Sequence, residues 1–209
     1  MRAGLVALCA FAACWLGGCE SLQVDRITLH HAQQVGVDTI PGAGQVSVAV
    51  YVYDRRDAVA PDLFGKWGKA EVGFGRNGLG EQTYPDIVVT EPVELTLKRA
   101  IEDELKARGF HVDRHADYAM TIDVNTFFND YKVGIILSDS VADLNMEVRV
   151  LSNDGRVRYS RTISAQGRKA LASPMDSFDA RIALNRALDQ GIQALFDDRA
   201  LLNTLITDR

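Results

Sequence analysis

The chain has 209 residues, of which 47% are hydrophobic and 24% charged, and its formal net charge at pH 7 is −5. This composition is typical of a folded domain and excludes a disordered or low-complexity chain. The acidic balance, with no run of basic residues, argues against nucleic acid as a partner and against electrostatic attachment to anionic lipid.

The first eighteen residues have the pattern of an export signal. Arg2 supplies positive charge, residues 3–15 are uncharged and mostly apolar, and small residues follow. The apolar run is too short for a transmembrane helix, which needs about 20 residues. We therefore expect residues 1–18 to be a cleaved signal peptide.

The segment Leu16-Gly17-Gly18-Cys19 resembles the lipobox of bacterial lipoproteins, whose cysteine thiol receives a diacylglyceryl group. The resemblance implies cleavage before Cys19 and membrane attachment through that residue. The alternative is an ordinary signal peptide with an incidental cysteine. Cys9 and Cys14 precede the cleavage point and no cysteine follows it, which excludes disulfides and zinc-thiolate sites in the mature chain.

Glu20 bears on which membrane holds the anchor. In enterobacteria-like sorting, aspartate after the lipidated cysteine retains a lipoprotein in the inner membrane. Glu20 therefore favours the outer membrane, with the domain in the periplasm and the inner membrane as the alternative.

The mature chain begins with a polar stretch that we interpret as a lipid anchor and tether over residues 19–45. Residues 46–53 are dense in β-branched and aromatic side chains and predict the first strand. Residues 57–90 are rich in glycine and proline and predict a long loop or floppy hairpin. Loops of this length tend to be functional or disordered, so this one is the leading interaction candidate.

The second half of the chain alternates helical and strand patterns. Apolar positions at helical spacing run from Thr90, as N-cap, to Gly109. The later elements are strands at about 117–129, 141–152 and 156–167, a turn at Asn153-Asp154-Gly155-Arg156, a helix at about 176–197, and an amphipathic end at 201–206. The helix has one apolar stripe, interrupted only by Asn185, made of Phe178, Ile182, Asn185, Leu188, Ile192 and Leu195.

The resulting fold prediction is α+β: a mostly antiparallel sheet of about four strands with two helices on one face, in the order β-α-β-β-β-α. The folded domain would span residues 46–209.

A set of short segments in this order is similar to the YajG-type family of bacterial envelope lipoproteins. The segments are Asp54-Arg55-Arg56, Arg76-Asn77-Gly78-Leu79-Gly80, Glu104 to Phe110, Phe128 to Gly134, Asn153 to Arg156 with Tyr159-Ser160, and Leu195 to Asp198. The resemblance implies an envelope lipoprotein with no catalytic residues to carry over and no named substrate. Leu79 stands where the family usually has an aromatic residue.

Two patterns suggest cofactor or metal chemistry but lack its context. Residues 73–78 match G-x-G-x-x-G, which binds dinucleotides only between a strand and a helix, and no helix follows here. His111 and His115 have the i,i+4 spacing of zinc ligands but come after the helix end at Gly109. We expect no cofactor and no metal.

Other patterns are candidates for binding. Residues 54–57 read as a turn with surface ion pairs, or as a partner contact. Of Phe127 and Phe128, one must face outward if the strand alternates, and that ring either packs under the glycine-rich loop or marks a partner surface. The candidate binding residues are Asp54, Arg55, Arg76, Asn77, Gly78, Leu79, Gly80, Phe127 and Tyr131.

These observations predict a lipid-anchored periplasmic lipoprotein that is not an enzyme, since no catalytic motif is present. It would bind or support the assembly of another envelope component, either a protein or peptidoglycan. Two alternatives remain open: a ligand-binding module for peptidoglycan fragments, a lipid or a glycolipid, and a structural subunit of an envelope complex.

Overall fold

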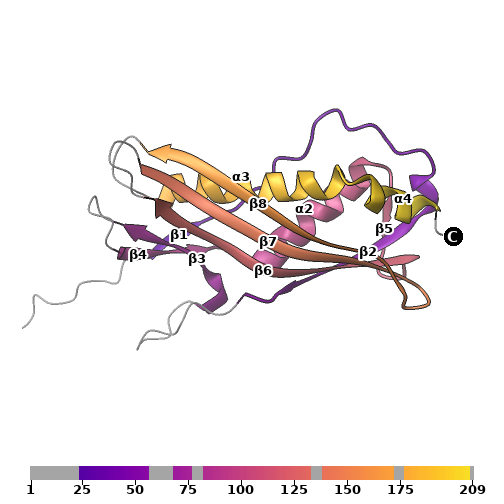
Figure 1. The fold of residues 1–209 in the computed structure, drawn as a ribbon, viewed down its shortest axis with the longest axis horizontal. Helices are drawn as coiled ribbons and strands as arrows, with labels where there is room; N and C mark the ends of the chain where they lie inside the picture. The colour runs from indigo at the N-terminus through magenta and orange to yellow at the C-terminus, as the bar shows by residue number, and fades with distance from the viewer. Residues whose placement is uncertain (1–23, 57–67, 77–81, 133–137, 172–176, 208–209) are drawn as a thin grey trace, which may run out of the picture.

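The computed structural model describes residues 24–56, 68–76, 82–132, 138–171 and 177–207 (Figure 1). The strands are β1 Val24–Ile27, β2 Ser47–Asp54, β3 Glu71–Arg76, β4 Gln82–Val89, β5 His111–Val112, β6 Tyr118–Lys132, β7 Ser138–Ser152 and β8 Val157–Leu171. The helices are α2 Val93–Ala107, α3 Ser177–Phe196 and α4 Arg199–Thr207, with 3₁₀ turns η1 Ala43–Gln45 and η2 Gly68–Ala70.

The strands form one mixed sheet with β6 at its centre. On one side β6 pairs antiparallel with β7, and β7 with β8. On the other side β2 lies parallel to the first half of β6, and Gly73 of β3 lies opposite Asn129 in its second half. Beyond β3 come β4 and β1, and beyond β2 comes the short β5.

A bulge in β6 changes which side chains face the helices. The pairing register with β7 shifts between Val124 and Thr126, so one residue is left over in β6. Val124 and Phe127 are both buried in the core as a result. Phe128 then points to the opposite face of the sheet.

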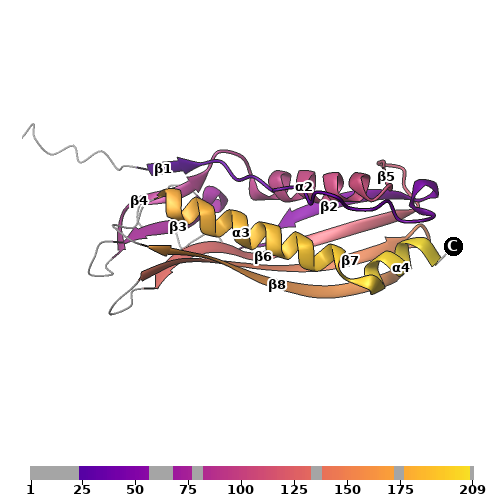
Figure 2. The same cartoon turned by 90° about the horizontal axis from the view of Figure 1, so that it is seen from above.

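Helices α2 and α3 lie on the same face of the sheet (Figures 1 and 2). Helix α3 crosses β6, β7 and β8, and α2 lies along β2. The buried face of α3 carries small residues, and a Cβ added at Gly167 of β8 would lie 1.9 Å from the carbonyl oxygen of Ala183. This helix therefore packs against the sheet at backbone contact.

The α+β class is as predicted, but the predicted architecture is wrong. The sheet has eight strands and is mixed, not four and mostly antiparallel, and three helices are described rather than two. The last of them, α4, is the amphipathic end predicted at 201–206. The parallel pairs β1–β4, β2–β5 and β2–β6 join segments far apart in the chain, which local patterns cannot reveal.

Two segments expected to be irregular contain regular structure. Within 57–90, β3 and β4 form an antiparallel pair, so the long-loop prediction fails there and only its hairpin alternative fits. The supposed tether over 19–45 includes β1, and Leu29 and Ala43 are buried in the core. Glycine and proline lower the local strand propensity of a segment, which is why the sequence predicted irregular structure in 57–90. Pairing with other strands outweighs that local propensity in the folded protein.

None of the helices in the described part of the chain is both long enough and apolar enough to cross a bilayer. The signal peptide and Cys19 lie outside the described residues.

Candidate functional site

The turn after β2 holds a buried ion pair rather than a surface one. Arg56 is 8% exposed, and its Nη2 donates to Asp54 Oδ2 at 2.8 Å. Its Nη1 donates to the backbone oxygens of Glu71 and Phe127 at 3.2 and 3.0 Å. Arg56 thus joins β2, β3 and β6. Asp54 stabilises the fold because it accepts hydrogen bonds from Arg56 and holds that side chain in place.

Arg55 has the opposite environment. Its side chain is 58% exposed, its Nε donates to Asp123 Oδ1 at 2.9 Å, and its guanidinium lies 5.1 Å from the ring centre of Tyr53. Asp123 also accepts from Arg149 Nη2. Arg55 therefore remains available to a partner on the helix-free face of the sheet.

The aromatic candidates divide in a similar way. Phe127 and Tyr131 are 1% and 4% exposed, so they are core residues and not surface contacts. The outward ring is Phe128, which meets Phe74 of β3 edge to face at 4.9 Å. This contact favours packing under the glycine-rich segment, one of the two alternatives for that ring.

Most of the remaining candidate binding residues lie outside the part of the chain that the structure describes. Arg76 ends β3, while Asn77, Gly78, Leu79 and Gly80 lie outside the described residues. Gly73 and Gly75 of the G-x-G-x-x-G match lie within β3, in strand rather than phosphate-loop context.

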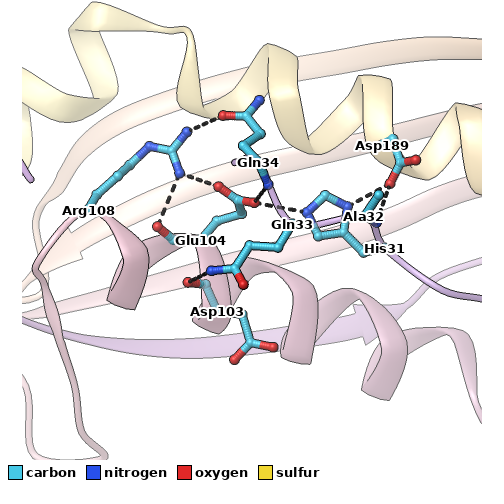
Figure 3. Close-up of polar contacts among 8 residues, drawn as sticks. All are labelled: His31, Ala32, Gln33, Gln34, Asp103, Glu104, Arg108 and Asp189. Carbon is cyan, nitrogen blue, oxygen red and sulfur yellow. Dashed lines mark hydrogen bonds and ion pairs between the residues drawn. The ribbon is translucent and has the colours of Figure 1, made fainter. Parts of the chain in front are cut away.

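A buried polar cluster holds residues 30–34 between α2 and α3 (Figure 3). The sequence analysis did not predict this cluster. His31 contacts Asp189 Oδ1 through Nδ1 at 2.7 Å and Glu104 Oε1 through Nε2 at 3.1 Å. Glu104 is fully buried, accepts from the backbone N–H of Gln34 at 2.8 Å, and pairs with Arg108. The cluster binds the chain just after β1 to both helices.

The cluster shifts the pKa values of its members. Burial lowers the pKa of His31, but hydrogen bonds to Asp189 and Glu104 outweigh it and leave that pKa raised. Burial raises the pKa of Glu104, but hydrogen bonds from Gln34, Arg108 and His31 outweigh it and leave that pKa lowered. Both shifts favour the charged pair, which therefore stabilises the docked segment.

Backbone contacts on α3 reinforce this attachment. The backbone N–H of His30 donates to Asn185 Oδ1 at 3.1 Å, and that of Ala32 to Asp189 Oδ1 at 3.0 Å. Asn185 was the one polar residue within the apolar stripe predicted for this helix. That interruption is the sequence signal that could have indicated a docked chain.

The most accessible place for a partner to bind is the edge of β2 that faces away from β6. Backbone groups of alternate residues point to opposite edges of a strand. Arg55 donates to Val124 of β6, whereas the carbonyl of Val48 accepts from Asp113 on the other side. The backbone groups of Val50 and Val52 therefore point away from β6, to an edge where β5 pairs only with Ser47 and Val48 among the described strands.

A groove of about 650 Å³ follows this edge. Its walls come from β2, from the solvent-facing side of α2 and from the chain after β5. The lining residues are Ala49, Val50, Tyr51, Lys98, Glu102, Lys106, Val112, Asp113 and Arg114. An extended chain could lie there and pair with β2, because an unpaired strand edge is a template for another strand.

Comparison with known families decides the class of protein. A family model described as uncharacterized lipoprotein (Lipoprotein_16) matches residues 74–206, which is more than half of the chain. The chain belongs to this lipoprotein family. Membership is consistent with attachment to a membrane, and it assigns no function.

One solved structure supports the fold, and another is similar over much of the chain. The Xanthomonas campestris protein XCC0632 is 22% identical, with a TM-score of 0.52 over 82% of this chain and 92% of its own. A minor lipoprotein from Acinetobacter baumannii is 11% identical, with a TM-score of 0.41 over 75% of this chain and 92% of its own. No functionally curated protein matches the chain.

Proposed function

We propose that this lipoprotein is of the YajG type, is anchored through Cys19 to the outer membrane with its domain in the periplasm, and binds an extended segment of another envelope protein along the free edge of β2. It acts as a non-enzymatic binding or assembly module. The observation that carries this proposal is the edge of β2 beside Val50 and Val52, lined by the groove against α2.

Strand addition fits this edge better than the other long edge. Among the described strands β8 also pairs on one side only, but arginines and a lysine recur along it, and charge on an edge strand discourages pairing. The exposed stretch of β2 reads Val-Tyr-Val-Tyr, which is favourable for strand pairing, and Tyr51 and Tyr53 are 40% and 45% exposed.

The charges of the groove favour an acidic occupant. Lys98, Lys106 and Arg114 face Glu102 and Asp113, an excess of one positive charge on a chain whose net charge is −5. A second copy that paired through the same edge would bring two positively charged grooves together, so an extended segment with carboxylate side chains is the better partner.

The ligand-binding alternative has less support. It requires a deep apolar pocket between the helices and the sheet. At α3 the helix and β8 are in backbone contact at Gly167, and a Cβ at Gly191 would lie 2.5 Å from Cδ2 of Leu144. A structural-subunit role would use the same β2 edge as a permanent contact.

The non-enzymatic assignment is supported by how the buried charged groups are used. Arg56 joins three strands, and Glu104 with Arg108 joins the N-terminal segment to α2. Each of these groups is engaged in holding elements together.

The test is photocrosslinking in cells with a photoreactive residue at Tyr51, compared with one at Val35, which is 98% exposed and away from the groove. A recurrent protein adduct from position 51 alone is the expected result. Adducts only to lipid or glycan would overturn protein binding and support the ligand-binding alternative. Equal adducts from both positions would contradict a site at this edge.

A matched pair of proline variants tests the edge itself. Val52→Pro removes an N–H that points to the free edge, whereas Tyr53→Pro removes one that points to β6. We expect Val52→Pro to abolish the adduct while the domain stays folded, and Tyr53→Pro to destabilise the fold by about 3 kcal/mol. An undiminished adduct in a folded Val52→Pro variant would refute strand addition.

A further inference from the structure

The N-terminal segment fixes where the lipid anchor leaves the domain. β1 pairs with β4 from Val24 onward, and the cluster around His31 binds the following residues to α2 and α3. Cys19 precedes Val24 by five residues. Five residues reach at most about 17 Å when fully extended, so an anchor at Cys19 would hold the start of β1 within about that distance of the membrane.

The start of β1 lies at one end of an elongated molecule. β4 and α3 also begin at this end, and β3, β6 and β8 finish there (Figures 1 and 2). Strands of fifteen residues are about 50 Å long, so the β7–β8 turn and α4 lie far away at the other end. An anchor with a 17 Å reach therefore orients the domain rather than letting it tumble freely.

The first turn of α3, at the same end, carries an unexpected side chain. Phe178 was predicted on the buried stripe of this helix but is 54% exposed. The guanidinium of Arg181 lies 5.1 Å from its ring centre. An exposed aromatic ring with a long cationic side chain suits the boundary between lipid and water, where the ring meets apolar atoms and the cation meets phosphate.

We propose that the end of the domain at which β1 and α3 begin faces the lipid bilayer, with Phe178 and Arg181 in contact with the headgroup region. This rests on the proposed attachment through Cys19. Exposed Lys132, which ends β6 opposite Asp139 of β7, adds a second cation at this end. The β2 groove is then directed away from the membrane surface, toward partners in the periplasm.

The lipidated full-length protein allows a direct test, because cleavage and acylation leave no free thiol. Single cysteines at Ser177 and, as the distal control, at Asn153 are labelled with an environment-sensitive fluorophore. Each protein is reconstituted into phosphatidylethanolamine–phosphatidylglycerol vesicles that contain a headgroup-attached quencher. We expect loss of most of the emission at position 177 and almost none at position 153, because the two positions lie about 50 Å apart.

Two further readouts separate the possible failures. Flotation of the vesicles reports anchoring independently, so a chain that does not float would overturn both the anchor and the orientation. A chain that floats but is quenched equally at both positions would overturn the orientation alone. Phe178→Ala, introduced with the label at 177, should reduce the quenching, and unchanged quenching would remove Phe178 from the contact.

Discussion

The two halves of this molecule are held together by different physical means. Helix α3 meets β7 and β8 through small residues: a Cβ at Gly167 would clash with the helix backbone, and one at Gly191 would crowd the side chain of Leu144. Helix α2 and the N-terminal segment meet through buried charge, with Glu104 at the centre. Close apolar packing with the backbones in contact allows only one arrangement of helix and sheet. The stability of a polar cluster depends on every hydrogen-bond partner being present and on the pH at which its groups are charged.

The difference suggests a division of roles. In the α3 half the contact at Gly167 brings helix and sheet together at backbone distance. The α2 half contains the open edge of β2 and the docked chain that leads back to the anchor. The proposed binding edge and the chain that leads to the proposed anchor therefore both belong to the half whose interface depends on pH.

The largest expected effect comes from breaking the polar cluster. Glu104→Ala leaves Arg108 buried without its carboxylate and should cost about 4 kcal/mol, as is usual when one partner of a buried pair is removed. Urea denaturation measures the loss, and hydrogen exchange should show residues 30–34 released first. Glu102→Ala, which removes a neighbouring carboxylate that is partly exposed, is the control and should cost less than about 1 kcal/mol.

The next effect tests the tight packing of α3. Gly167→Ala places a Cβ 1.9 Å from the oxygen of Ala183 and 2.5 Å from the nitrogen of Ala187, both backbone atoms that cannot rotate away. We expect a loss of about 3 kcal/mol in the free energy of unfolding. Gly155→Ala is the control, because that glycine has a φ of +77° but open space around it, and it should cost only about 1 kcal/mol. Equal losses in the two variants would contradict the backbone contact at Gly167.

The pH dependence separates the two halves, because only the α2 half has a titrating histidine in its interface. The pKa of His31 is raised, so its contribution is complete below the ordinary value of 6.5 and is lost as pH rises through the raised pKa. The pKa of Glu104 is lowered, so its contribution is complete above 4.5 and is lost as pH falls. Docking of residues 30–34 is therefore strongest between these two values.

Hydrogen exchange of that segment at about pH 6 and about pH 8 measures the effect, with faster opening expected at the higher pH. His31→Gln keeps hydrogen-bonding groups but cannot titrate in this range, so it should remove the difference. His115→Gln, at a fully exposed side chain, should leave it intact. A pH response that survives in His31→Gln would assign the effect to another group.

The sequence predicts the elements with regular patterns well. The helix between Thr90 and Gly109 and the three later strands follow from apolar periodicity, and the Asp154-Gly155 turn follows from the need for a positive φ. It fails for β1, β3 and β4, which are short or interrupted by glycine and proline. Those strands exist because partners far away in the chain satisfy their backbone groups.

The candidate site was predicted less well, for related reasons. Asp54 and Arg56 looked like surface charges, but β3 covers them, so they became buried connectors. Phe127 moved into the core because a bulge in β6 shifts the alternation, and nothing in the local pattern indicates a bulge there. The groove along β2 depends on β5 being short, so that no other described strand pairs with Val50 and Val52, and no local motif predicts such a topology.

The smallest predicted effect concerns the junction of α3 and α4. The hydroxyl of Tyr159 donates to Asp198 Oδ2 at 2.8 Å, while Asp198 Oδ1 accepts from the N–H of Ala200 at the start of α4. Tyr159→Phe removes one hydrogen bond but leaves Asp198 paired with Arg161, so it should cost about 1 kcal/mol or less. Asp198→Ala should cost more, because it also removes the helix cap.

The phenol also provides a spectroscopic check of the same contact. Burial and the hydrogen bond to Asp198 both raise the pKa of Tyr159, so its phenolate should form above the ordinary tyrosine pKa of 10.0 in an alkaline absorbance titration. Asp198→Asn should lower that pKa because it removes the negative charge beside the phenolate. An unchanged titration would mean that burial alone holds the proton and that Asp198 serves α4 only. The fold would then keep its C-terminal helix through the cap and through apolar Leu201 and Leu205.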